Sequence, residues 1–376
     1  MFGGGSFTSQ NKVLPGSYIN FVSAARAAAA VSDRGIVAVP LTLSWGLEKT
    51  AFEVTAEDFQ KNCMAIFGYP YDAPELLPLR EVFRYAVKGV FYRLTAGTKA
   101  ANNYATARYG GVRGNAIKIV VAKNVDDESK YDVKTYLDSK LVDEQTVATA
   151  AVLKDNDYVI FKKDSTLAAT AGIALAGGAD GEAPTGTEHS AFLAAMESHT
   201  FHVLCCPVTD DSTKALYVSY TKRLRDEAGV KFQTVMYQKA ADYEGVISVE
   251  NETEELEHGL VYWTAGAEAA CAVNKTNENR TYDGEYTVKA DYTQTQLIEG
   301  IKDGKFMFHK VGNEIRVLMD INTLTHYTDE KSEDFSSNQT IRVLDQIGND
   351  IAAMFNDRYL GKVPNDDAGR VSLWND

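Results

Sequence analysis

The sequence predicts a multidomain protein of the α/β (α+β) class, in which a split, mixed-sheet α/β core is interrupted by an inserted β-sandwich or barrel domain. Nearly continuous apolar runs at residues 36–43 and 87–94 are typical of strands buried on both faces. Short alternating runs then follow one another between residues 95 and 186. Alternation of helix and strand patterns resumes after residue 187, so we expect one sheet built from two separate stretches of chain.

An extended arm, residues 1–22, precedes the first stretch of the core, residues 23–94. Strand propensity follows a Pro-Gly break at six arm residues: Ser17, Tyr18, Ile19, Asn20, Phe21 and Val22. A lone strand has unpaired backbone groups on both sides, so the arm either frays or adds to the edge of another sheet. Within the core stretch, we expect strands at 36–43 and 87–94 and helices at 56–67 and 76–86.

The inserted region, residues 95–186, is rich in Ala, Thr, Gly, Asp and Lys. We expect its strands at residues 116–122, 131–137, 146–152 and 158–163. Short strands about ten residues apart with polar turns favour a separate β-sandwich or barrel. The region ends in the Gly-rich sequence LAGGADG, residues 175–181.

The second stretch of the core, residues 187–265, predicts two βα repeats and a further strand. Helices are expected at 190–198, 214–229 and 260–273, and strands at 201–207, 231–238 and 245–251. Farther along, two strand patterns flank residues 311–313, and the Gly-Asn pair between them indicates a β-hairpin.

A helix of about five to six turns is expected at residues 338–359, with Ser336 or Ser337 as its cap and Gly361 followed by Pro364 as its stop. Its apolar residues recur at three- and four-residue spacing: Ile341, Leu344, Ile347, Ile351, Met354, Phe355 and Tyr359. Its opposite face carries Asp345, Asn349, Asp350, Asn356 and Asp357. The pattern alone is that of a surface helix with its apolar stripe in the core and its acidic face in water, unless a partner covers that face.

Composition limits the possible partners. The 376 residues are 45% hydrophobic and carry a net charge of −14. No apolar run approaches the roughly 18 residues that span a bilayer, and the N-terminus has no basic and apolar leader, so we expect a soluble protein of a cytoplasm-like compartment. Four cysteines in apolar surroundings indicate buried reduced thiols: Cys63, Cys205, Cys206 and Cys271. The acidic balance argues against direct nucleic-acid binding and favours basic partners.

The chain carries no enzyme signature, so we expect no catalytic residue, no cofactor and no metal. The Gly-rich residues 175–181 lack the Lys-Ser/Thr of a P-loop and the spacing of a dinucleotide fold. A cluster without zinc-site spacing comprises His189, His199, His202, Cys205 and Cys206. Strand alternation would put His202 and Cys206 on one face and Cys205 on the other. The alternative, an α/β enzyme, would have its site at the strand ends near residues 207–211.

Four segments together resemble the contractile tail sheath proteins of myophages and of phage-like particles of Gram-positive bacteria. These segments are LPGSYINF, RGIVAVPLTLSWG, LAGGADG and INTLTHYTDEKSEDFSSNQTIRVLDQIGNDIAAMFNDRYLGKVPNDDAGR. The resemblance implies a structural subunit of hexameric rings, stacked helically around a tail tube, that contract without ATP to drive the tube through the target cell envelope for genome ejection. It also implies assembly in the host cytoplasm, location in the virion tail, and four partners: further copies of the chain, the tail tube protein, and baseplate and tail terminator proteins. Membranes and nucleic acid are not among them. A related alternative is the sheath of an R-type bacteriocin or another contractile injection system.

The resemblance also assigns roles to parts of the chain. Residues 266–376 would form a C-terminal α/β domain facing the tube, which makes Asp345, Asp350 and Asp357 candidates for a tube contact. The six arm residues, Ser17 to Val22, would join a neighbour's sheet. In related sheaths a further helix and strand follow the NDDAGR-like segment, whereas this sequence ends at Asp376. We therefore expect a C-terminal domain without that strand, and a polypeptide that alone stays monomeric or associates weakly.

Overall fold

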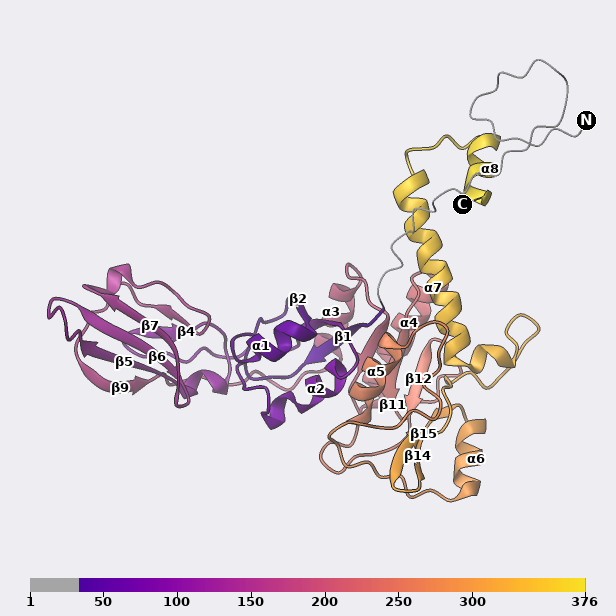
Figure 1. Cartoon of the computed structure of the whole chain (residues 1–376), viewed down its shortest axis with the longest axis horizontal. Helices are drawn as coiled ribbons and strands as arrows, with labels where there is room; N and C mark the ends of the chain where they lie inside the picture. The colour runs from indigo at the N-terminus through magenta and orange to yellow at the C-terminus, as the bar shows by residue number, and fades with distance from the viewer. Residues whose placement is uncertain (1–33, 376) are drawn as a thin grey trace, which may run out of the picture. The chain divides into compact units, whose positions relative to one another are not determined.

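The computed structural model of the chain describes residues 34–375 (Figure 1). A large unit comprises residues 34–349, and residues 350–375 belong to a second, small unit. The expected arm, Ser17, Tyr18, Ile19, Asn20, Phe21 and Val22, and the expected start of the core at residue 23 lie outside the described residues. None of the helices in residues 34–375 combines the length and apolar character needed to span a bilayer.

A seven-stranded sheet organises the large unit, in the order β13-β12-β11-β10-β1-β3-β2. Neighbouring strands run parallel except for β2, which is antiparallel to β3. Its strands are β1 (Ile36–Leu41), β2 (Ala51–Thr55), β3 (Lys88–Arg93), β10 (Val203–Cys206), β11 (Gln233–Tyr237), β12 (Val246–Val249) and β13 (Lys305–Phe306). Because β1 pairs with both β3 and β10, the sheet joins chain from before and after the insertion, and the predicted split mixed sheet is confirmed.

Helices pack on both faces of this sheet. Val37 and Val39 of β1 lie in a core cluster with side chains of α1 (Ala56–Phe67), α2 (Leu77–Phe83) and α5 (Leu260–Ala270). Ala38 lies in a second cluster with side chains of α3 (Gly186–Met196) and α4 (Asp211–Lys222). Successive strand residues point to opposite faces, so burial on both sides explains the continuous apolar runs.

The inserted region forms a four-stranded antiparallel sheet, β7-β6-β5-β9, and a two-stranded sheet, β4-β8. The strands are β4 (Ala105–Ala107), β5 (Ile117–Lys123), β6 (Tyr131–Leu137), β7 (Lys140–Val147), β8 (Val159–Phe161) and β9 (Thr170–Ala174). Strands β7 and β9 remain at the edges, so the described sheet does not close into a barrel. The strand expected at 146–152 is wrong: the sheet ends at Val147, and residues Ala150–Val152 form a 3₁₀ turn with Ala150 buried.

The chain after β12 contributes further elements besides α5 and β13. It forms α6 (Gln294–Lys302), the strands β14 (Phe308–Val311) and β15 (Glu314–Val317), and α7 (Asn338–Met354). β14 and β15 pair antiparallel, which confirms the hairpin, and Gly312 adopts φ +63° at its turn. α7 is followed by a π-helical turn, Phe355–Tyr359, as the predicted helix at 338–359 requires. The small unit also contains α8 (Asp367–Asn375).

Candidate functional site on helix α7

The middle of helix α7 has the reverse of its expected orientation. On its polar side, Arg342 is 1% exposed and Asp345 is 6% exposed. On its apolar side, Leu344, Ile347 and Ile351 are 43%, 50% and 54% exposed. The interpretation of an apolar stripe in the core and Asp345 in water is therefore wrong for this helix, although Ile341 is buried as expected. We call Leu344, Ile347 and Ile351 the outer stripe.

Asp345 is held by Arg225, which lies in a π-helical turn, Arg223–Glu227, directly after α4. Its two guanidinium nitrogens Nη1 and Nη2 donate to Oδ2 and Oδ1 of Asp345 at 2.6 and 2.8 Å. Arg225 also donates to the carbonyl oxygen of Phe232. Both charged side chains are almost fully buried, so the pair is a two-point bond shielded from water and salt. Asp345 is thus an anchor inside this chain, which corrects its assignment to an exposed contact face.

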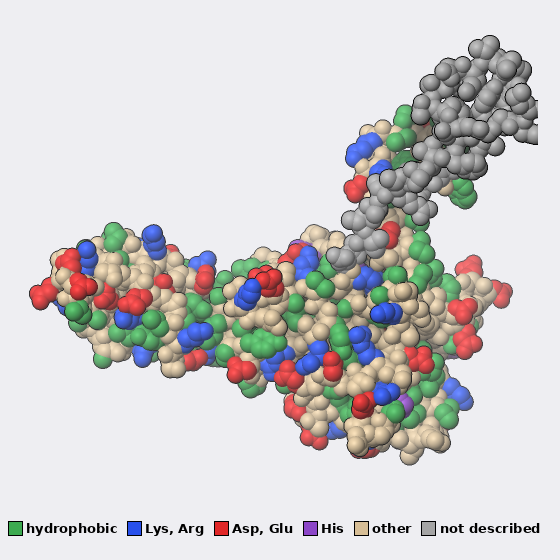
Figure 2. Space-filling model, in the orientation of Figure 1, with side chains coloured by type: hydrophobic (Ala, Val, Ile, Leu, Met, Phe, Trp, Pro, Cys, Tyr) green, Lys and Arg blue, Asp and Glu red, His purple; other side chains and the backbone are tan. Residues whose placement is uncertain are grey.

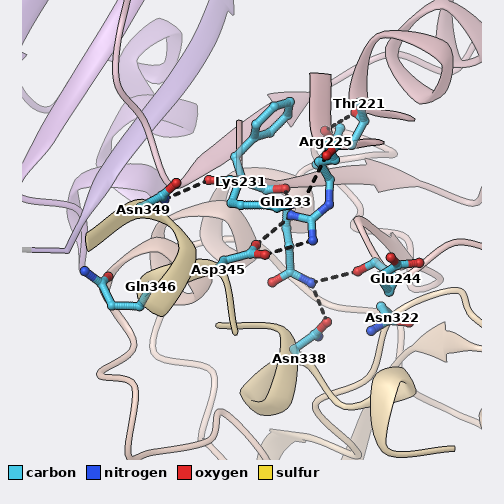
Figure 3. A network of polar contacts seen from close by, with 12 residues as sticks. Thr221, Arg225, Lys231, Gln233, Glu244, Asn322, Asn338, Asp345, Gln346 and Asn349 are labelled. Atoms are coloured by element: carbon cyan, nitrogen blue, oxygen red, sulfur yellow. Dashed lines mark hydrogen bonds and ion pairs between the residues drawn. The ribbon is translucent and has the colours of Figure 1, made fainter. Parts of the chain in front are cut away.

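A second polar contact fixes the first turn of α7 (Figure 3). The Nε2 atom of Gln233 in β11 donates to Oδ1 of Asn338 at 3.0 Å and to the carbonyl oxygen of Glu244 at 3.1 Å. The Nδ2 atom of Asn338 in turn donates to Oδ1 of Asp320 at 2.9 Å. Both amide side chains are therefore hydrogen-bonded although the residues are buried.

Arg342 occupies the centre of a third contact. Its Nη2 donates to Oε2 of Glu268 at 2.6 Å and to Oδ2 of Asp320 at 3.3 Å, and its Nη1 donates to the carbonyl oxygen of Lys275. All three charged side chains are at most 2% exposed. Two carboxylates face one guanidinium here, and burial together with Asp320 raises the pKa of Glu268 to about 8.

We call the buried polar residues Asn338, Arg342 and Asp345, with their partners, the α7 base. Their hydrogen bonds hold the first turns of the helix in one position. Hydrogen bonds between charged groups form only when α7 has one rotation about its axis and one position along that axis. A shift of one residue would leave buried charges without partners. Sequence reasoning missed Arg225, Glu268 and Asp320, whose partners on α7 lie 120, 74 and 22 positions away along the chain. The signal available was on α7 itself: Asn338, Arg342, Asp345 and Asn349 recur at the same helical spacing as the apolar residues.

The other two acidic candidates differ from Asp345. Asp357 is exposed and Asp350 is half-buried. Further acidic side chains gather on the exposed loop that precedes α7, where Figure 2 shows a red cluster at the edge of the molecule. That loop supplies Asp329, Glu330, Glu333 and Asp334, all exposed.

The remaining candidates from the sequence are not brought together. Cys205 and Cys206 face opposite sides of the sheet, which confirms the predicted alternation. Nδ1 of His202 accepts from the backbone N–H of Ile36 at 3.3 Å, and burial lowers the pKa of His202 to about 4. His189 is bonded to Tyr217. In residues 34–375, no three His, Cys, Asp or Glu side chains are grouped as metal ligands.

Near residues 207–211, the site expected for an enzyme, the start of α4 is capped from within the chain. Asp210 caps α4, and its carboxylate accepts from the backbone N–H of Thr213 at 2.7 Å. A helix N-terminus binds phosphate through such N–H groups, and here an internal carboxylate takes that position.

Four family models match successive segments of the chain. They are the Tail sheath protein Gp18 domain III N-terminal region over residues 34–94 and the phage tail sheath protein beta-sandwich domain over residues 95–180. The phage tail sheath protein central domain matches residues 182–323, and the phage tail sheath C-terminal domain matches residues 330–376.

Individual relatives agree with these models. The chain is 37% identical to the phage-like element PBSX protein XkdK of Bacillus subtilis, over 93% of this chain and 81% of that protein. The solved sheath tail protein of Desulfitobacterium hafniense is 39% identical, with a TM-score of 0.84 over 96% of this chain and 86% of that one. The sheath tail protein of Listeria innocua is 34% identical, with a TM-score of 0.78 over 91% and 82%.

Proposed function

Because this chain belongs to the phage tail sheath protein family, we propose that it forms hexameric rings that stack helically around a tail tube and contract without ATP. Contraction would drive the tube through the target cell envelope. The protein would assemble in the host cytoplasm and become part of the virion tail, with the tube, baseplate and tail terminator proteins as its partners. It would act as a structural motor and not as an enzyme.

The observation that supports this proposal best is the match of four sheath segments, in order, over residues 34–376. Repeated heterologous contacts between identical subunits generate helical stacks, and strands that add to a neighbour's sheet can keep subunits linked while they rotate. Contraction then exchanges one set of subunit contacts for a more stable one, so stored free energy takes the place of ATP.

We assign the link between subunits to the arm residues Ser17, Tyr18, Ile19, Asn20, Phe21 and Val22. About four to six hydrogen bonds worth roughly 1 kcal/mol each would form. Ordering the backbone costs about 1–2 kcal/mol per residue. The hydrogen bonds of one arm therefore do not offset the cost of ordering it, and side-chain burial and repetition through the lattice must supply the net stability.

We assign the tube contact to Asp350 and Asp357, with a basic tube surface as the partner. The protein's net charge of −14 favours such a partner. Asp345 is left out of this contact because its carboxylate is bonded to Arg225 inside the chain.

Negative-stain microscopy of the chain expressed with the tube protein of its own particle tests this function. We expect sheathed tubes, and fewer of them at high salt. Asp350→Lys with Asp357→Lys should lower the sheathed fraction at least fivefold. The matched control is Asp126→Lys with Asp164→Lys, which reverses two exposed acidic residues of the inserted region. Equal loss in both variants would contradict the contact, and absence of any polymer with the tube would contradict the function.

The relative named for a phage-like element makes a phage-derived particle the second candidate, since the subunit would act in the same way there. Immunogold labelling of particles released by the native host distinguishes a phage from a phage-derived bacteriocin. Labelled tails attached to DNA-filled heads support a phage, and labelled tails without heads support a bacteriocin.

A further inference from the structure

The inserted region meets the seven-stranded sheet through three backbone segments that bond to one another. The N–H of Thr98 donates to the carbonyl oxygen of Ala179 at 2.8 Å, and the N–H of Ala179 donates back to Thr98 at 3.2 Å. The N–H of Gly111 also donates to the carbonyl oxygen of Thr98, at 3.0 Å. The chain that enters the region is therefore paired with the chain that leaves it, in the manner of antiparallel strands. The three segments are residues 95–98, 110–112 and 176–181.

Glycine permits the close approach of these segments. A β-carbon added to any of five glycines would lie at most 2.6 Å from a backbone carbonyl oxygen elsewhere in the chain. No side chain fits at such a distance, so these backbones can meet only where there is none. The five are Gly97, Gly110, Gly111, Gly178 and Gly181. Two of them belong to the Gly-rich residues 175–181, whereas the neighbouring Gly177 has open space around it and adopts φ +79°.

The chain that follows β1 supplies part of the core of the inserted region. Trp45 is 1% exposed and lies in one cluster with Ile117 and Ile119 of β5. The centre of its ring is 5.3 Å from that of Tyr109 and 6.4 Å from that of Tyr158. Aromatic pairs at these distances attract each other beyond the effect of the area they bury. A side chain from the first stretch of the core therefore stabilises the inserted region.

Two carboxylates connect the same parts of the chain. Oε1 of Glu48 accepts from the N–H of Gly110 at 2.6 Å. Oδ1 of Asp180 accepts from the N–H of Val112 at 3.1 Å, and its Oδ2 accepts from the hydroxyl of Ser44 at 2.9 Å. Hydrogen bonds to a charged acceptor are stronger than those between neutral groups. Each carboxylate thus ties the first stretch of the core to the inserted region.

We propose that these contacts form a joint that makes the inserted region and the seven-stranded sheet unfold as one cooperative unit. The joint comprises residues 44–48, 95–98, 110–112 and 176–181. The inference concerns a single chain, so it does not depend on ring assembly, a tube or contraction. It gives the Gly-rich residues 175–181 a role other than ligand binding, because their glycines let separate backbones meet at one place.

Hydrogen exchange of the full chain in increasing urea, measured by mass spectrometry, tests the proposal. Peptides from β5 and β6 report on the inserted region, and peptides from β10 and β11 report on the sheet. In the unmodified chain, the two sets should lose protection at urea midpoints that agree within about 0.2 M. In Gly181→Ala the added β-carbon meets the carbonyl oxygen of Ala96. Each part should then unfold at the midpoint set by its own core, and the midpoints should separate by at least about 0.5 M.

Gly177→Ala is the matched control in the same Gly-rich sequence, because its added β-carbon meets nothing within 4 Å. Its φ is strained for alanine, but the joint can still close, so both midpoints should fall together. Asp180→Ala removes two hydrogen bonds without adding a clash, and it decides the question if Gly181→Ala does not fold. It should separate the midpoints by at least about 0.3 M.

Three outcomes would overturn the proposal. Separate midpoints in the unmodified chain would show that the two parts unfold independently. Midpoints that stay together in Asp180→Ala and in folded Gly181→Ala would show that these contacts do not join the two parts. An equal separation in Gly177→Ala and Gly181→Ala would show that the close approach of the backbones is not the cause.

Discussion

Helix α5 packs against the protein interior through apolar side chains, whereas helix α7 does so through charged and amide side chains. Nearly every residue of α5 is buried, and apolar side chains such as Leu260 and Trp263 fill the core against the sheet. The first turns of α7 are instead held by Arg342, Asp345 and Asn338. Apolar packing is non-directional and follows buried area, whereas ion pairs and amide bonds demand fixed geometry. The apolar packing of α5 therefore stabilises the fold through buried area. The polar bonds of α7 fix the orientation of that helix and leave its apolar side exposed.

Removal of Arg342, the cation at the centre of the α7 base, should have the largest effect on the free energy of unfolding. Arg342→Ala leaves Glu268 and Asp320 buried without their guanidinium, and we expect the free energy of unfolding to fall by about 4 kcal/mol. Urea unfolding followed by circular dichroism measures it. Arg342→Met combined with Glu268→Gln removes one of the two carboxylates left without a cation and should restore at least half of the loss. A loss below about 1 kcal/mol for Arg342→Ala would show that the charges are not anchoring α7.

A matched pair of leucines compares the two helices directly. Leu260 of α5 is fully buried, and Leu344 of α7 is 43% exposed. Leu260→Ala should lower the free energy of unfolding by about 3 kcal/mol, because it removes buried area and leaves a cavity. Leu344→Ala should cost about 1 kcal/mol. Equal losses in urea unfolding would mean that both leucines belong to one continuous core.

Two acidic residues, Asp345 of α7 and Asp357 of the π-helical turn after it, should differ less in their effect on stability. Asp345→Asn removes the charge that faces Arg225 and should lower the free energy of unfolding by about 2 kcal/mol. Asp357→Asn, on an exposed residue, should change it by less than about 0.5 kcal/mol. The ratio of the two losses, measured in the same buffer, reports whether Asp345 is an anchor. A larger loss for Asp357→Asn would restore the original interpretation of an exposed acidic face.

The raised pKa of Glu268 should appear as a dependence of the free energy of unfolding on pH. The pKa of Glu268 rises from an ordinary 4.5 to about 8 on folding. The folded state therefore binds the proton more tightly, so the stabilisation is complete below pH 4.5 and is lost as the pH rises through 8. The slope from this group is at most about 1.4 kcal/mol per pH unit. Glu268→Gln should flatten the curve between pH 6 and 8, and an unchanged slope would assign it to other groups.

Much of the fold follows from local patterns. The boundaries predicted for α1, residues 56–67, agree with the structure, and the hairpin forms at the Gly-Asn pair. These elements carry their own signals: spacing, a Thr cap and a turn glycine. β2, at residues 51–55, was missed because it is a short edge strand that depends on its partner β3. α6, at residues 294–302, was missed although Thr293 and Gln296 form a capping box at its start.

The sequence by itself determined that residues 338–359 form a helix with two unlike faces, because helix formation depends on local spacing and stop signals. Only the tertiary structure decided which face is inside. Arg225 and Glu268 lie far away in the sequence and reach α7 only when α4, α5 and the sheet are in place. A hydrophobic pattern describes the cost of exposing apolar side chains to water, but buried partners of opposite charge can reverse that preference over several turns of a helix.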